Sequence, residues 1–135
     1  MIRVMFLCTG NSCRSQMAEG LARELGKGKI EAYSAGLAPS QVNPYAVRVM
    51  QEIGIDISRQ TSKAINQDLI LKMDVVITLC GHAEVLCPMT PPQVKRLHWP
   101  IDDPILATGT ENEVLLEFRR ARDQIRENLR SFMGK

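Results

Sequence analysis

The possible folds of this chain are constrained most by an apolar run that leads into a loop of mostly small polar residues. Residues 2–7 are mostly apolar, residues 8–15 read Cys-Thr-Gly-Asn-Ser-Cys-Arg-Ser, and residues 16–22 favour a helix. The order is therefore strand, loop, helix. In such a loop the backbone N–H groups converge on one point, to which the following helix N-terminus adds partial positive charge. The pattern predicts an oxyanion site within the loop.

Cys8 and Arg14 are the candidate catalytic side chains of this loop. The field that attracts an oxyanion also favours the ionised form of Cys8, which makes its thiolate the candidate nucleophile toward a bound tetrahedral oxyanion. The guanidinium of Arg14 can hold two oxygens of that ion. Gly10 is expected to permit a close backbone approach, and Asn11 to tolerate left-handed geometry. The predicted binding residues are Thr9, Gly10, Asn11, Ser12, Cys13, Arg14 and Ser15.

A strand-to-helix turn with incidental cysteines is the simpler alternative for this loop. Such turns seldom present a thiol, an arginine and a helix N-terminus together, so the oxyanion site is the favoured interpretation.

Beyond the loop, strand-like and helix-like segments alternate. Strands are expected at residues 30–36, 74–79 and 95–99, and helices at residues 44–53, 68–73 and 110–132. Asn43 followed by Pro44 is typical of a helix start, and residues 110–113 have the spacing of a capping box. Alternation of this kind is typical of parallel sheets. We therefore expect an α/β fold: a single domain over residues 1–135, with a four-stranded parallel sheet and helices on both faces.

The composition is typical of a soluble globular protein. The chain has 135 residues, 44% of them hydrophobic and 24% charged, with a net charge of +2, and nothing in this balance requires a nucleic-acid partner. No apolar run is long enough for a membrane span or a signal peptide. We expect a cytoplasmic monomer that binds neither nucleic acid nor membranes. Its four cysteines are then reduced thiols, suited to catalysis, redox chemistry or metal binding.

The last predicted helix has an apolar face and a charged face. The apolar face is expected to contain Val114, Phe118, Ala121, Ile125, Leu129 and Phe132. Arginines interleave with acidic residues on the remaining surface, an arrangement typical of a solvated face rather than of a nucleic-acid patch. These arginines are Arg119, Arg120, Arg122, Arg126 and Arg130.

Three candidate residues follow strands at one edge of the predicted sheet. Ligand sites of parallel sheets lie beyond the carboxyl ends of the strands. Cys8 and Cys80 both stand directly after a strand, and the fourth strand leads to Asp103. We expect these side chains to converge.

Cys80 and Cys87 form a second group of thiols, seven positions apart. On a short helix they would share one face, but a rise of about 10 Å would keep them from bonding unless the helix unwinds. Two buried structural thiols remain an alternative, as does a metal site built from Cys80, His82 and Cys87. The short Cys-x2-Cys spacing of zinc modules is absent, which disfavours the metal site.

Residues 8–20 resemble the anion loop of the low-molecular-weight protein tyrosine phosphatase superfamily, and most closely that of its thioredoxin-coupled arsenate reductases. The similarity covers nearly the whole chain, including residues 33–36, 54–58, 78–80, 88–92 and 98–99. Phosphatases of this superfamily normally carry an aromatic residue after the Asp-Pro pair, and Ile105 stands there instead.

The resemblance implies a mechanism and a role for each matching residue. The Cys8 thiolate attacks arsenic in arsenate, Arg14 and the loop hold the oxygens, Ser15 helps to stabilise the thiolate, and Asp103 protonates the departing oxygen. Cys80 then attacks Cys8 in the adduct, which releases arsenite and leaves a Cys8–Cys80 disulfide. Cys87 exchanges with it to form a Cys80–Cys87 disulfide, which thioredoxin or a similar dithiol reduces. No organic cofactor or metal is required.

Two other functions remain open. A phosphatase would use the same loop and acid but would leave Cys80 and Cys87 without a role. A non-enzymatic arsenic or metal sensor would use the cysteines as ligands and would not need Asp103.

Lys63 departs from a pattern seen in some of these reductases. Those members bind potassium beside the anion loop, through residues that match Asn11, Glu19 and Ser34 and through an aspartate where Lys63 stands. We expect the Lys63 ammonium to repel a cation and to lie beside Glu19.

Overall fold

Strand β1, Ile2–Cys8, has a neighbour on each side. In the computed structural model, which describes residues 1–81 and 90–134, β1 lies between β2 (Ile30–Gly36) and β3 (Val75–Thr78), and β4 (Lys95–His98) follows β3. All these pairs are parallel, in the order β2-β1-β3-β4. The carboxyl ends of the strands therefore meet at one edge, as the sequence predicts.

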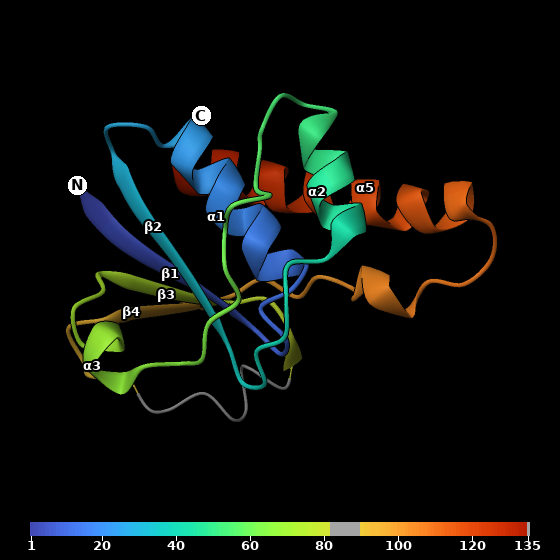
Figure 1. Ribbon diagram of the computed structural model, residues 1–135. Helices are drawn as coiled ribbons and strands as arrows, with labels where there is room; N and C mark the ends of the chain where they lie inside the picture. Colours follow the sequence, from blue (N-terminus) through green and yellow to red (C-terminus); the bar gives the residue numbers. More distant parts are fainter. Residues whose placement is uncertain (82–89, 135) are drawn as a thin grey trace.

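The interior strands are apolar because both of their faces are covered. Residues 4–7 of β1 have no exposed surface, and all four residues of β3 are buried. Helices α1 (Arg14–Leu25), α2 (Pro44–Gln51) and α5 (Glu111–Phe132) pack together on one face of the sheet, and α3 (Gln67–Ile70) lies on the other (Figure 1). The predicted four-stranded α/β fold is confirmed.

Two helices are shorter than predicted. The helix expected at residues 68–73 is the four-residue α3, which begins where the Asn66 side chain accepts a hydrogen bond from the Leu69 N–H. Helix α2 begins as expected, with Asn43 capping and Pro44 at its first position, but ends at Gln51, before a turn with Gly54 at φ 78°.

The predicted capping box opens α5. The Thr110 hydroxyl accepts a hydrogen bond from the Glu113 N–H at 3.2 Å, and the Glu113 carboxylate accepts one from the Thr110 N–H at 3.3 Å. Most of the expected apolar face is buried, although Val114 and Phe132 are only half-buried and Leu115 takes a core position instead.

Arg122 is the exception to the predicted solvated face. It is buried, and its Nη1 donates to the Val49 carbonyl at 2.8 Å and to Glu52 Oε1 at 2.9 Å. The prediction for this arginine was wrong because the carboxyl end of α2 packs on α5 and needs a donor there. Arg122 therefore ties α5 to α2.

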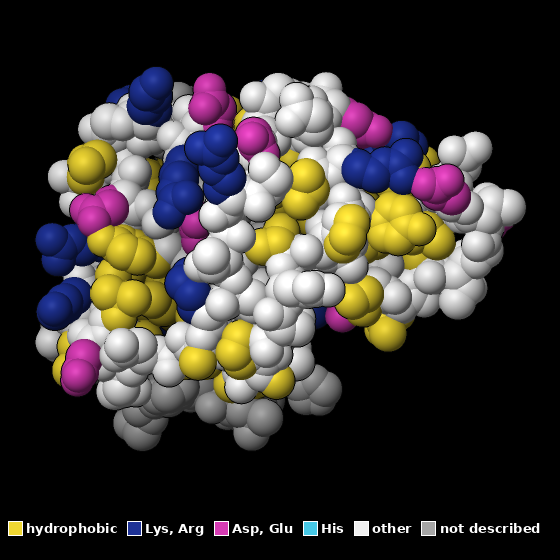
Figure 2. Space-filling view, viewed as in Figure 1, with side chains coloured by type: hydrophobic (Ala, Val, Ile, Leu, Met, Phe, Trp, Pro, Cys, Tyr) yellow, Lys and Arg dark blue, Asp and Glu magenta, His cyan; other side chains and the backbone are white. Residues whose placement is uncertain are grey.

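The outer surface carries mixed charge. On the face shown in Figure 2, Lys and Arg side chains are interspersed with Asp and Glu rather than forming one continuous basic surface. None of the helices in the described part of the chain has both the length and the apolarity needed to cross a membrane.

The contact between α2 and α5 can be tested through the pH dependence of stability, because Glu52 at the end of α2 pairs with Arg119 and Arg122 of α5. Hydrogen bonds from Arg119, opposed by partial burial and helped by Arg122, lower the pKa of Glu52 from 4.5 to about 2. A lowered pKa means that the carboxylate stabilises the fold above about pH 4.5 and loses this effect as the pH falls toward 2. Because the Glu52 side chain is 38% exposed, solvent screening limits the effect, and Glu52→Gln should reduce the unfolding free energy by about 0.5 to 1 kcal/mol at pH 7.

Urea unfolding at a series of pH values measures this difference. Most of it should be lost by about pH 2, where about half of the wild-type carboxylate is protonated as well. Glu117→Gln is the matched control, because within the described residues Glu117 pairs with Arg120 of its own helix and with no other basic side chain. A Glu52→Gln effect that does not change with pH would contradict the ion-pair interpretation.

Candidate active site

The anion loop, residues 8–15, lies where β1 ends and α1 begins. Cys8 is the last residue of β1, and α1 starts at Arg14. Cys13, at the N-cap position, makes no side-chain hydrogen bond to the helix. The first N–H groups of α1 are thus not satisfied by a capping side chain and can bind an anion.

The loop borders a cavity of about 210 Å³. Its lining is Cys8, Thr9, Gly10, Ser12, Cys13, Arg14, Ser40, Asp103 and Ile105. The structure thus brings together the predicted nucleophile, arginine and acid. The cavity can hold a small tetrahedral oxyanion beside the Cys8 sulfur.

Asn11 and Ser15, two of the predicted binding residues, contribute no side chain to the cavity. Their side chains are fully buried and do not line the cavity. They support the loop from behind, because Asn11 adopts φ 47°, as expected, and its Nδ2 donates to Ser15 Oγ at 2.7 Å.

A short series of hydrogen bonds fixes the direction of the Ser15 hydroxyl. The Lys63 N–H can only donate, and it donates to Asn11 Oδ1 at 2.7 Å, so Asn11 must turn its amide nitrogen toward Ser15. Ser15 Oγ accepts that bond, which leaves its own hydrogen for Cys8 Sγ, 2.8 Å away. A donor directed at the sulfur stabilises the thiolate.

Arg14 is held by the segment that carries the predicted acid, residues 101–107, here called the acid segment. Its Nη1 donates to the Ile101 carbonyl at 2.9 Å, and its Nη2 lies 3.3 Å from Asp103 Oδ2. Asp103 also accepts a hydrogen bond from the Ile105 N–H, which caps the short 3-10 helix η1 (Pro104–Leu106). The guanidinium is therefore oriented before an oxyanion binds.

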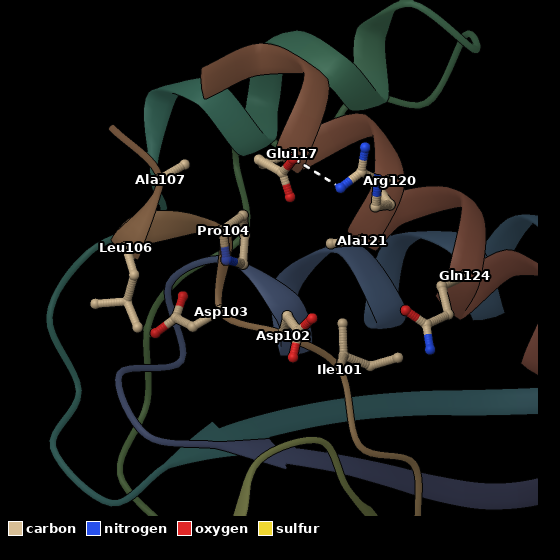
Figure 3. Close-up of a pocket in the computed structure, with 10 residues that line it drawn as sticks. All are labelled: Ile101, Asp102, Asp103, Pro104, Leu106, Ala107, Glu117, Arg120, Ala121 and Gln124. Carbon is tan, nitrogen blue, oxygen red and sulfur yellow. Dashed lines mark hydrogen bonds and ion pairs between the residues drawn. The ribbon is translucent and has the colours of Figure 1, made fainter. Parts of the chain in front are cut away.

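The acid segment packs against α5 and encloses a second cavity of about 350 Å³ (Figure 3). Figure 3 shows the Asp103 carboxylate pointing away from α5, in keeping with its ion pair to Arg14. On the α5 side, Arg120 pairs with Glu117 at 2.8 Å. Asp103 therefore borders both cavities, and its carboxylate is held toward Arg14 of the anion loop.

Gly10 is not the glycine that permits the close approach. A Cβ on Gly10 would meet its nearest neighbours at 3.6 Å, which is ordinary contact. A Cβ on Gly36, at the end of β2, would lie 2.7 Å from both Asn11 N and Thr9 O. The tight packing thus occurs where β2 ends against the anion loop.

The two cysteines of the loop have different chemistry. Burial raises the pKa of Cys13 to about 12, so this thiol stays protonated near neutral pH. Cys8 instead lies within hydrogen-bond distance of the Ser15 hydroxyl, which belongs to the first turn of α1. Of the two, Cys8 is the candidate nucleophile.

A third thiol lies at the same edge of the sheet. Cys80 directly follows Leu79, whose N–H donates to the Leu7 carbonyl at 2.8 Å beyond the end of β3. Its Sγ is 3.2 Å from the hydroxyl of Thr9, next to the predicted nucleophile. Cys87 and His82, which belong to the predicted relay and to the alternative metal site, lie outside the described residues. Within residues 1–81 and 90–134, no three His, Cys, Asp or Glu side chains are grouped so that they could hold a metal ion.

Lys63 lies beside Glu19, as predicted. Its Nζ is 3.8 Å from Glu19 Oε1 and also donates to the Thr61 carbonyl. Glu19 is buried and accepts a hydrogen bond from Ser34 at 2.6 Å, while Arg23 lies 2.9 Å from its other oxygen. Two basic side chains thus surround this carboxylate.

Sequence reasoning missed two features of the site. Ser40 lines the cavity, and the Ile101 carbonyl orients Arg14. Neither belongs to a chemical motif; their only indication in the sequence is that each comes shortly after a strand, at the edge where ligands bind.

The family model described as low molecular weight phosphotyrosine protein phosphatase matches residues 3–135. Arsenate reductases of Bacillus subtilis and Halalkalibacterium halodurans are 54% and 53% identical to the chain, over 96% of this chain and 93% of each relative.

Solved structures agree with the family match. An arsenate reductase in the phosphate-binding state aligns with a TM-score of 0.81 at 41% identity, covering 99% of this chain and 98% of that one. A low molecular weight protein tyrosine phosphatase from T. tengcongensis aligns with a TM-score of 0.85 at 26% identity, covering 99% of both chains. A thioredoxin-dependent arsenate reductase of Corynebacterium glutamicum aligns with a TM-score of 0.75 at 29% identity, covering 98% of this chain and 62% of that one.

The position of Lys63 predicts a weak response to potassium. Replacing sodium by potassium at equal ionic strength should leave the melting temperature and the activity nearly unchanged, because the ammonium beside Glu19 repels a further cation. Thermal unfolding in matched sodium and potassium buffers is the measurement. A saturable rise in melting temperature that is specific to potassium would contradict this prediction.

Proposed function

Because the chain belongs to the low molecular weight phosphotyrosine protein phosphatase family, we propose that it uses this family's anion loop to reduce arsenate to arsenite. The observation that carries the proposal is the position of Cys80, whose sulfur is 3.2 Å from the Thr9 hydroxyl at the anion loop. Hydrolysis of a phosphate ester through Cys8 would have no use for this second thiol. The arsenate reductases among the relatives support the same conclusion.

The first step is a substitution at arsenic. The loop N–H groups and Arg14 hold the oxygens of arsenate while the Cys8 thiolate attacks. A bond forms between sulfur and arsenic, and a bond between arsenic and oxygen breaks. Asp103 gives its proton to the departing oxygen, which leaves as water. Ser15 stabilises the Cys8 thiolate through the hydrogen bond described above.

The second step transfers two electrons to arsenic. Cys80 attacks the sulfur of Cys8, so that a Cys8–Cys80 disulfide forms and the sulfur–arsenic bond breaks. The electron pair of that bond stays with arsenic, which leaves as arsenite. The two thiols are oxidised, and arsenic is reduced from the pentavalent to the trivalent state.

The enzyme is then returned to its starting state by thiol exchange. Cys87 attacks Cys80, which frees Cys8 and forms the Cys80–Cys87 disulfide, and thioredoxin or a similar external dithiol reduces this bond. The thioredoxin-dependent reductase among the structural neighbours supports the choice of reductant. All electrons in the proposed cycle come from cysteines of this chain and from an external dithiol, so the cycle requires no metal or organic cofactor.

A stoichiometric reaction tests the reductase proposal. Reduced protein mixed with one equivalent of arsenate, without any other reductant, should release about one arsenite and lose two thiols per chain, because one disulfide supplies two electrons. Arsenite is measured by separation of the arsenic species, and thiols by titration with a chromogenic disulfide. Unchanged thiols together with turnover of an aryl phosphate would instead establish a phosphatase.

Cys87→Ser tests the last thiol of the relay. Since Cys8 and Cys80 suffice for one round, this variant should release about one arsenite per chain and then stop, with a Cys8–Cys80 disulfide that peptide mapping identifies. Cys80→Ser should fail in the first round, and Cys13→Ser is the matched control with an intact relay. Sustained turnover of Cys87→Ser with thioredoxin would rule out this role for Cys87.

A further inference from the structure

Ser40 contributes a hydroxyl to the anion cavity from outside the loop and the acid segment. It belongs to residues 37–43, between β2 and α2, here called the rim segment. Ser40 lines the same cavity as Cys8, Arg14 and Asp103. The reaction steps derived above do not use it.

The rim segment is fixed against the anion loop by backbone hydrogen bonds. The N–H groups of residues 37, 38, 40 and 43 donate to the carbonyls of residues 8, 9, 10 and 12, at 2.8 to 3.3 Å. Figure 1 shows the two segments side by side beyond the ends of β1 and β2. Ser40 is therefore held at a fixed position relative to the anion loop.

A second serine strengthens this attachment. The Ser62 hydroxyl donates to the Gly10 carbonyl at 3.0 Å and accepts the Ser40 N–H at the same distance. The Ser62 side chain holds the two segments together but does not line the cavity. The backbone of Ser40 is thus satisfied without its side chain.

The hydroxyl of Ser40 is available to a ligand. It has no hydrogen-bond partner within residues 1–81 and 90–134. Its Oγ lies 3.6 Å from the point where a Cβ on Gly10 would stand, so it is held over the loop backbone. A side chain larger than a methyl group at position 10 would enter this space, which gives Gly10 a reason other than close backbone packing.

We propose that the Ser40 hydroxyl donates a hydrogen bond to the oxygen of the bound oxyanion that faces out of the anion loop. This oxygen is the one that takes the proton of Asp103 and leaves when sulfur bonds to arsenic, and Ser40 keeps its own proton throughout. The loop N–H groups and Arg14 hold the inner oxygens. The proposal rests on the proposed function for the position of the oxyanion.

A hydrogen bond from Ser40 should favour the binding of an inorganic oxyanion over that of a phosphate ester. The outward atom of arsenate or phosphate is a charged or hydroxyl oxygen, which is a good acceptor. In an aryl phosphate the outward atom is the ester oxygen, which carries the ring and is a poor acceptor. Loss of the Ser40 hydroxyl should therefore weaken binding of inorganic oxyanions more than binding of esters.

Inorganic phosphate is the probe, because it binds without being reduced. Calorimetric titration of Ser40→Ala with phosphate should give a dissociation constant about ten-fold higher than that of the wild type, equal to about 1.4 kcal/mol. Ser40→Thr, which keeps the hydroxyl, should restore most of the affinity. The dissociation constant for an aryl phosphate, measured by its competition with phosphate, should differ by less than about two-fold between Ser40→Ala and the wild type.

Ser62→Ala is the matched control. It loosens the rim segment without removing a hydroxyl from the cavity, so it should lower the melting temperature and leave phosphate affinity per folded molecule within about two-fold. Equal phosphate affinity of wild type and Ser40→Ala would overturn the proposal, as would an equal loss in Ser62→Ala. If the wild type binds phosphate but releases no arsenite from arsenate, the reductase function fails while the phosphate titrations still decide the role of Ser40.

Discussion

The side-chain amide of Asn11 links the anion loop to a segment of the chain that is 52 positions away. Its oxygen accepts the backbone N–H of Lys63, and its nitrogen donates to the hydroxyl beside Cys8. The backbone carbonyl of Asn11 accepts a hydrogen bond from the Gln16 side chain. Asn11 adopts a left-handed conformation, at φ 47°, that an unsupported residue seldom keeps. The curvature of the anion loop and the orientation of its nucleophile therefore depend on one buried amide.

The elements that are encoded locally could be predicted from the sequence. The strand over residues 30–36 has the predicted bounds, and Thr110 with Glu113 forms the predicted cap, because each depends on neighbouring residues. The convergence of Cys8, Cys80 and Asp103 follows from parallel strands alone, since their carboxyl ends must share one edge.

The remaining features depend on contacts between residues that are distant in the sequence. Arg14 is oriented by a carbonyl 87 positions away, and Asn11 by an N–H 52 positions away. The sequence does not indicate which residue a backbone carbonyl or N–H will bond to, so neither hydrogen bond could be predicted. Arg122 was predicted to be solvated but is buried for the same reason, because its burial depends on where the end of α2 packs. The roles of Gly10 and Gly36 could be told apart only once the rim segment and the end of β2 had been placed against the loop.

The rim segment separates reactivity from selectivity in this architecture. It is attached to the anion loop through backbone atoms, so most of its side chains are not needed to keep it there. Substitutions in this segment can change which molecules enter the cavity while the nucleophile and its supporting amide stay intact. A single scaffold can in this way diverge toward different oxyanion substrates through a few exchanges outside the reactive loop. The division between a reactive loop and a border attached through its backbone makes such a fold readily adaptable by evolution and by design.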